Sequence, residues 1–140
     1  MKLSFAPMEG ISSYIYRSLH ARFFGGVEEY FAPFIAPDGN GSFKASSLRD
    51  ILPENNRDIK LVPQLLVNWP EPFIHVAGEL AAMGYREVNL NIGCPSATVV
   101  AKHKGSGMLL DLAGLDACLN EIFSRSVPAV SIKTRMGMET

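Results

Sequence analysis

Stretches with the period of a β-strand alternate along this sequence with stretches that have the period of an α-helix. Apolar residues at a spacing of four predict helices between the strands, as with Ile15, Leu19 and Phe23. Strands that are separated by helices pair in parallel, so the alternation predicts an α/β fold. Five short apolar runs predict the strands, at residues 2–6, 30–35, 60–66, 87–92 and 129–133.

The faces of the later strands favour a β/α barrel over a doubly wound sheet, although both are compatible with the alternation. In the fourth strand, Asn89 and Asn91 share one face, and apolar residues occupy the other. A strand covered by helices on both sides should be apolar on both faces, whereas barrel strands turn polar where they open into an active-site mouth. Gln64 and Lys133, near the ends of the third and fifth strands, fit the same placement.

The length of the chain limits how much of a barrel it can form. A complete eight-stranded barrel takes about 250 residues, whereas this chain has 140. We therefore expect a partial TIM barrel with about five of eight β/α units. On this interpretation residues 1–140 are the N-terminal part of a TIM-barrel catalytic domain.

The composition limits which binding partners and which cellular compartment we expect for this chain. With 13 Lys+Arg against 14 Asp+Glu, the net charge of −1 argues against a broad electrostatic grip on nucleic acid, although a local contact remains possible. No apolar run approaches the roughly 20 residues of a membrane helix, so we expect a cytoplasmic protein with no membrane contact. Cys94 and Cys118 should then be reduced thiols, and without a CxxC pair we expect no metal site.

Cys94 is the strongest candidate for chemistry. It follows the fourth strand directly, between Gly93 and Pro95, which restrict the backbone and present the thiol at the mouth. The alternative is a small buried hydrophobic residue, but the neighbouring asparagines favour a site. An unassisted thiol has a pKa of about 8.5 and is mostly protonated at neutral pH. No histidine can be assigned as its base, so it is better suited to donating a proton than to nucleophilic attack.

Three further segments are candidates at the same mouth. Lys133 is either a solvated cation or, together with Gln64, a group that holds a cofactor which becomes negative on reduction. The turn at 7–10 is either a plain turn or a surface for a flat ligand, with Met8 as a soft apolar contact. The loop at 99–107 is either a surface loop or a lid with glycine hinges.

Four landmarks in this order resemble the tRNA-dihydrouridine synthases. They are APMEG at 6–10, Gln64, NLNIGCP at 89–95 with GSGMLL at 105–110, and SIKTRMG at 131–137. The family reduces uracil in tRNA to dihydrouracil with FMN, which is itself reduced by NADPH. The resemblance implies that this chain carries the flavin-ring side of such a site.

The resemblance also implies roles for individual residues. Cys94 is expected to give a proton to C5 of uracil while the flavin delivers hydride to C6. Asn91 and Arg135 are expected to hold the uracil and the flipped nucleotide, because a stacked base cannot face the flavin. The expected FMN contacts are Pro7, Met8, Glu9, Gln64 and Lys133.

The sequence departs from the family at the end of the second strand, where Ala32-Pro33-Phe34 replaces a residue that is acidic in many members. The family's next histidine, its flavin-phosphate loops and its helical tRNA-binding domain would all follow Thr140. For this chain alone we expect weak FMN affinity, no turnover and self-association through the exposed edges of the first and fifth strands. Two alternatives stay open: an FMN-dependent barrel that acts on a free pyrimidine, and a non-catalytic, self-associating half-barrel.

Overall fold

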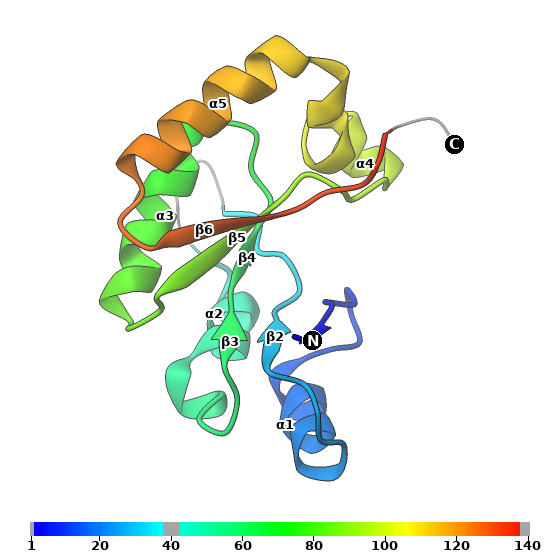
Figure 1. The fold of residues 1–140 in the computed structure, drawn as a ribbon, viewed down its shortest axis with the longest axis vertical. Coiled ribbons are helices and arrows are strands. Elements are labelled where there is room, and N and C mark those ends of the chain that lie inside the picture. Colours follow the sequence, from blue (N-terminus) through cyan, green and yellow to red (C-terminus); the bar gives the residue numbers. More distant parts are fainter. Residues whose placement is uncertain (1, 38–42, 138–140) are drawn as a thin grey trace.

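The computed structural model describes residues 2–37 and 43–137, and every strand pairing in it is parallel. Figure 1 shows the strands running through the middle of the molecule, with helices outside them. The mixed α/β fold with parallel sheets that the sequence predicts is therefore confirmed. The strands are β1 (Ser4–Phe5), β2 (Glu29–Phe31), β3 (Leu61–Val62), β4 (Gln64–Leu65), β5 (Glu87–Asn91) and β6 (Ala129–Lys133).

The third predicted strand is divided in two by Pro63. β3 pairs with β2 and β4 pairs with β5, giving the orders β1-β2-β3 and β4-β5-β6. Proline has no N–H to donate to a neighbouring strand, which explains why the ladder is interrupted here. A parallel bridge between Ile35 and Leu65 joins the two sheets. The backbone therefore continues from one sheet to the other without changing direction.

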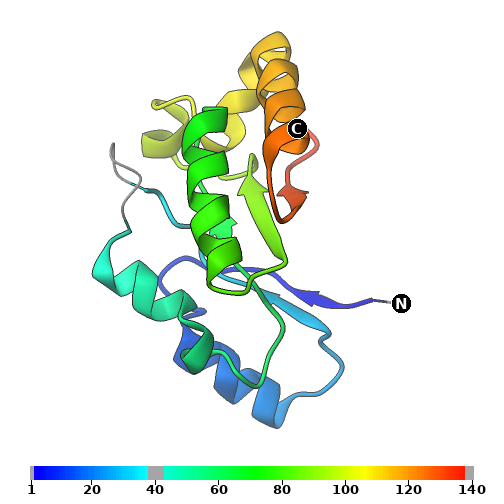
Figure 2. The ribbon, with the colours of Figure 1, turned by 90° about the vertical axis from the view of Figure 1, so that its left-hand side faces the viewer.

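The strands follow one another in chain order. A doubly wound sheet reverses its strand order at one point, and the described strands show no such reversal. The helix α3 lies in front of the strands when the molecule is viewed from the left of Figure 1, as Figure 2 shows, and α2 lies beside them. This arrangement excludes a doubly wound sheet for the described strands. A barrel of about five units remains a prediction.

Helices occur where the sequence predicts them, between successive strands. α3 begins at Pro70, a residue well suited to the first helical position, and ends before Gly84, whose φ is +99°. None of the helices in the described part of the chain combines the length and the apolar character needed to cross a membrane. The helical elements are α1 (Tyr14–Phe23), α2 (Ala45–Ile51), η1 (Pro53–Asn55), α3 (Pro70–Ala82), α4 (Ala97–Val100), η2 (Gly105–Leu110) and α5 (Leu112–Arg125).

The main core lies between β4–β6 and the helices α3 and α5. Phe73 and Leu80 of α3 and Ile122 of α5 are completely buried there, together with Val88 and Leu90 of β5. Burying a side chain of this size contributes about 1.5–3 kcal/mol. Cys118 of α5 belongs to this core, and burial raises the pKa of its thiol. This core supports the strands that carry the polar residues described below.

α1 forms as predicted, but its apolar stripe is not its buried face. Ile15, Leu19 and Phe23 are 55%, 49% and 69% exposed, whereas Arg17 is completely buried. Arg17 forms an ion pair of 3.0 Å with Asp50 of α2, and this contact turns the arginine face of α1 inward. A spacing pattern predicts that a helix forms, but not which face a distant partner will cover.

Candidate active site

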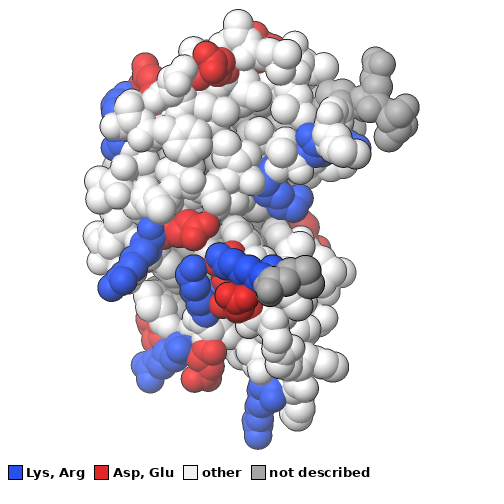
Figure 3. All heavy atoms as spheres, in the orientation of Figure 1, with Lys and Arg blue, Asp and Glu red and all other residues white. Residues whose placement is uncertain are grey.

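A cavity of about 180 Å³ lies at the carboxyl ends of the strands. Figure 3 shows the surface hollowed on the right-hand side, with basic side chains at the border of the hollow. The cavity brings together six of the eight residues that the sequence predicts for the site. Its lining residues are Pro7, Glu9, Pro33, Phe34, Gln64, Asn91, Gly93, Cys94, Pro95 and Lys133.

Met8 and Arg135 are not among the lining residues. Met8 is 38% exposed and lies between Pro7 and Glu9, both of which contribute to the cavity wall. Arg135 follows the end of β6 and is partly exposed. The cavity therefore brings together Cys94, Lys133 and Gln64, as the sequence predicts. Met8 and Arg135 lie outside its lining.

Side-chain amides from neighbouring strands form a buried hydrogen-bonded chain beneath the cavity. Gln64 Nε2 donates to Asn89 Oδ1 at 2.7 Å, and Asn91 Nδ2 donates to Gln64 Oε1 at 2.8 Å. At the far end, Asn89 Nδ2 donates to Ser131 Oγ at 2.9 Å. All three amide side chains are buried. The shared face of Asn89 and Asn91 that the sequence predicts is thus confirmed, with Gln64 and Ser131 as their partners.

Backbone donors determine the direction of this chain of amides. Asn91 Oδ1 accepts hydrogen bonds from the N–H of Gly93 at 3.0 Å and the N–H of Cys94 at 2.9 Å. A backbone nitrogen can only donate, so the oxygen of Asn91 must face the loop and its nitrogen must face Gln64. Gln64 must then donate to Asn89. Asn91 is therefore the group that connects the strand framework to the backbone of Cys94.

The segment after Cys94 packs tightly against it. Both the backbone N–H and the Oγ of Ser106 donate to the carbonyl oxygen of Cys94 at 3.0 Å. A Cβ on Gly105, whose φ is +55°, would lie 2.7 Å from that same oxygen. A Cβ on Gly107 would lie 2.9 Å from the carbonyl oxygen of Val100. These buried glycines permit close approach of the segment to the backbone of Cys94 and Val100. The lid with glycine hinges at 99–107 stays a prediction.

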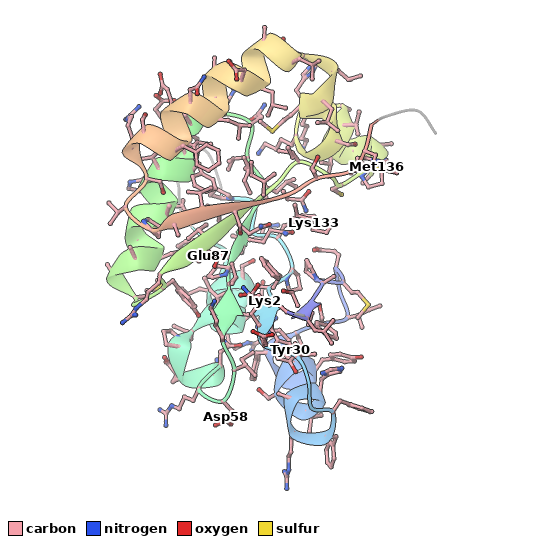
Figure 4. The ribbon with its side chains drawn as sticks, in the orientation of Figure 1. Lys2, Tyr30, Asp58, Glu87, Lys133 and Met136 are labelled. Carbon is pink, nitrogen blue, oxygen red and sulfur yellow. The ribbon has the colours of Figure 1, made fainter. Side chains whose placement is uncertain are left out.

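The cavity contains charged groups of both signs and an apolar wall. Lys133 points from the end of β6 toward the β1 side of the molecule in Figure 4, and it makes no ion pair with any described residue. Partial burial raises the pKa of the Glu9 carboxyl. Pro33 and Phe34 form an apolar surface opposite the strand amides. The arrangement suits a flat ligand that bears negative charge at one edge and meets a thiol.

Sequence reasoning missed part of the site. Pro33 and Phe34 lie within the predicted second strand at 30–35, whereas β2 ends at Phe31 and leaves both residues in the loop that lines the cavity. Ser131 shares its strand face with Lys133, which was a usable signal for its place in the amide chain. Ser106 has no local signal, because it reaches Cys94 from 12 residues away. Within 2–37 and 43–137, no group of three or more His, Cys, Asp or Glu is arranged as metal ligands.

Parallel strands in chain order, with a thiol, amides and a lysine at their carboxyl ends, define a β/α protein with a site where such proteins bind ligands. A family model described as "Dihydrouridine synthase (Dus)" matches residues 4–140. The chain belongs to the dihydrouridine synthase family.

Curated relatives carry related names. The chain is 29% identical over 138 residues to the "Probable tRNA-dihydrouridine synthase" of Staphylococcus aureus (strain Mu50 / ATCC 700699) and to that of Staphylococcus epidermidis (strain ATCC 12228 / FDA PCI 1200). It is 27% identical to the "Probable tRNA-dihydrouridine synthase 2" of Bacillus subtilis (strain 168). Each match covers 94% of this chain and 40% of the relative. The chain thus spans about two fifths of the length of these relatives.

Proposed function

We propose that this chain provides the flavin-ring side of a tRNA-dihydrouridine synthase, which reduces uridine in tRNA to 5,6-dihydrouridine with NADPH through FMN. The observation that carries the proposal is that Cys94, Gln64 and Lys133 line one cavity at the strand ends. Family membership and the names of the relatives support the same activity. A thiol without a catalytic base suits the proton-donor role that this reaction requires.

The cavity residues fit one edge of a flavin ring. Pro7, Pro33 and Phe34 provide apolar surface for a flat ring system. Gln64 Nε2 uses one hydrogen on Asn89, which leaves its second hydrogen for a ring acceptor. The ammonium of Lys133 would stabilise negative charge that develops when the ring is reduced. We assign Pro7, Glu9, Gln64 and Lys133 as FMN contacts from the cavity, and Met8 as one from outside it.

Cys94 is the proposed proton donor. When bound, the flavin supplies hydride to C6 of uracil. The Sγ of Cys94 gives its proton to C5, so that the C5=C6 double bond becomes a single bond, and the resulting thiolate regains a proton from water. The backbone of Cys94 is held from both sides, by Asn91 at its N–H and by Ser106 at its carbonyl. These hydrogen bonds fix the position of the Cys94 backbone, from which the thiol side chain extends. A directed proton transfer needs such a fixed position.

Asn91 and Arg135 are proposed to bind the substrate. The oxygen of Asn91 is committed to the loop, so only its second amide hydrogen is free to reach a uracil carbonyl. Arg135 lies beyond the cavity and suits the backbone of the extruded nucleotide better than the base. Extrusion is required because a stacked uracil cannot meet the flavin.

The chain is proposed to form about five units of a β/α barrel in the cytoplasm, with tRNA as partner. The remaining three fifths of the relatives' length would supply the flavin-phosphate loops and most of the tRNA contacts. We also propose that the isolated chain binds FMN weakly, does not turn over, and self-associates through the edges of β1 and β6, the first and last strands in the order. Gel filtration of this chain with stoichiometric FMN tests that proposal. A monomeric yellow protein would contradict it.

A substrate assay tests the proposed function. The natural protein that contains these residues should form dihydrouridine on tRNA with NADPH and FMN, and should not reduce free uracil or oxidise dihydroorotate. Turnover on a free pyrimidine with none on tRNA would instead assign the chain to another FMN-dependent barrel. Lys133→Ala should weaken flavin binding or its reduction, whereas Lys104→Ala, outside the cavity lining, should leave both unchanged.

A further inference from the structure

The backbone of Met8 is held by Ser12. The N–H of Met8 donates to Ser12 Oγ at 2.8 Å, and Ser12 Oγ donates to the carbonyl oxygen of Met8 at 3.1 Å. The N–H of Ser12 donates to the same carbonyl at 3.0 Å. Ser12 is completely buried. Because Pro7 and Glu9 flank Met8 and line the cavity, this contact fixes the wall on either side of Met8.

Ser12 is itself anchored by a buried cation. Arg17 Nη1 donates to the carbonyl oxygen of Ser12 at 2.7 Å and to Asp50 Oδ2 at 3.0 Å. Asp50 Oδ1 accepts from the N–H of Tyr14 at 2.6 Å and so caps the first turn of α1 from α2. Ser13, at the N-terminus of α1, makes no such side-chain bond. The first turn of α1 is therefore tied to Asp50 of α2 at Tyr14 and at Arg17, and Ser12 is held through Arg17.

The anchor is completed by Asn56. Arg17 Nη2 donates to Asn56 Oδ1 at 3.0 Å and to the carbonyl oxygen of Asp50 at 2.7 Å, and Asn56 also donates to that carbonyl. Burying an ion pair adds little net stability compared with apolar packing of similar volume. Such a pair can nevertheless specify a single arrangement of the elements that it joins. Neither Arg17 nor Ser12 lines the cavity, so neither can contact a ligand there directly.

We infer that Ser12, anchored by the Arg17–Asp50 pair, is a positioning residue that holds the Pro7–Glu9 wall in the shape that receives the flavin ring. The inference rests on the proposed function, since it assigns the cavity to a flavin. It assigns no catalytic step to Ser12. Its effect passes through the Met8 peptide alone.

Ser12→Ala in the natural protein that contains these residues tests the inference. The variant keeps the backbone bond between Arg17 and residue 12 and removes only the hydroxyl. Deuterium exchange at the Met8 amide should accelerate, and the Kd for FMN should rise about tenfold, because the substitution removes both hydrogen bonds between the Ser12 hydroxyl and the Met8 peptide. The matched control is Ser4→Ala, which loses a hydroxyl bond to Glu29 at the other end of β1 and should leave FMN affinity unchanged.

The possible results separate the two claims. If Ser12→Ala exchanges faster at Met8 but binds FMN as tightly as the unmodified protein, the inference is wrong and the proposed function stands. If the unmodified protein binds no FMN, the proposed function fails. If Ser12→Ala does not fold, Ser12→Cys decides, because its weaker hydrogen bonds should accelerate exchange at Met8 and raise the Kd for FMN relative to the unmodified protein. Equal affinity in Ser12→Cys and the unmodified protein would overturn the inference.

Discussion

The two walls of the cavity are held by different means. On the β4–β6 side, amides on neighbouring strands bind one another directly, and the last of them binds the backbone of Cys94. On the β1–β2 side, the loop residues Pro7 and Glu9 flank Met8, whose backbone binds Ser12. The carbonyl of Ser12 in turn accepts a hydrogen bond from Arg17. The first wall follows from strand pairing alone, whereas the second requires α1 and α2 to meet. The wall that carries Cys94, the proposed proton donor, is thus held by side chains of its own paired strands.

The different support of the two walls predicts how many groups lose a hydrogen-bond partner after a single substitution. A defect in the amide chain should remain local to Gln64 and Cys94, because β5 is buried and pairs with strands on both sides. A defect at Arg17 should release several groups at once: Ser12, Asp50 and Asn56 all lose a partner. The two walls should therefore respond differently to substitutions that each remove one buried polar side chain.

The largest effect is expected for Arg17→Met. Removing Arg17 leaves the buried Asn56 and Asp50, whose side chain is 19% exposed, without their cationic partner. Breaking a fully buried ion pair costs about 3–5 kcal/mol, so for this partly exposed pair we expect the lower end, about 3 kcal/mol of unfolding free energy. Urea denaturation measures this loss. Arg22→Met, which removes an exposed cation 5.6 Å from the centroid of Phe23, should cost less than about 1 kcal/mol. Equal losses in the two variants would show that the Arg17 network does not hold the β1–β2 wall.

An intermediate effect is expected for Asn89→Leu. The change leaves the Nε2 of Gln64 without its buried acceptor, which costs about 1–3 kcal/mol. FMN affinity should fall as well, because Gln64 loses the bond that orients it. Asn120→Leu on the exposed face of α5 is the control and should change stability by less than about 0.5 kcal/mol. A loss as large as that of Arg17→Met would remove the contrast between the walls.

The smallest expected effect is a loss of stability in acid, and it depends on Glu29 of β2 in the sheet β1-β2-β3. Glu29 is buried and accepts from Lys2 at 2.8 Å, Lys60 at 3.0 Å and Ser4 at 2.9 Å, and Lys2 is labelled beside β2 in Figure 4. The hydrogen bond from Lys2, then those from Lys60 and Ser4, lower the pKa of the Glu29 carboxyl from 4.5 to about 2. The folded state therefore holds the ionised form more strongly than the unfolded state does.

This contribution is fully present above pH 4.5 and is lost as the pH falls toward about 2, when the folded protein also takes up the proton. Thermal melts at several pH values measure it, and added salt should reduce it because both lysines are mostly exposed. In Glu29→Gln this part of the acid dependence should be absent. An unchanged pH profile in that variant would assign the acid sensitivity to other carboxyls.

The sequence predicted the β4–β6 wall well, because its residues obey the two-residue period of a strand. Asn89, Asn91 and Lys133 were placed on one face by that period alone, and strand pairing then brought Gln64 to the same place. Cys94 was predicted at the mouth from its position after the strand. These placements need only local geometry and the parallel order of the strands.

The β1–β2 wall could not be predicted in the same way. The bond from Tyr14 to Asp50 spans 36 residues, and the bond from Arg17 to Asn56 spans 39. No local period reports such contacts, so the apolar stripe of α1 was a poor guide to its buried face. Serine is a residue type typical of a helix N-cap, whereas the hydroxyl of Ser12 binds Met8 and the cap of α1 comes from Asp50.

The central claim is that Cys94 gives a proton to the substrate across the cavity from the flavin. Rapid-mixing measurements on Cys94→Ala in the natural protein that contains these residues test it most directly. We predict that the variant binds FMN and is reduced by NADPH at the unmodified rate, but that reoxidation by tRNA and dihydrouridine formation are lost. Dihydrouridine formation at the unmodified rate in Cys94→Ala would contradict the account.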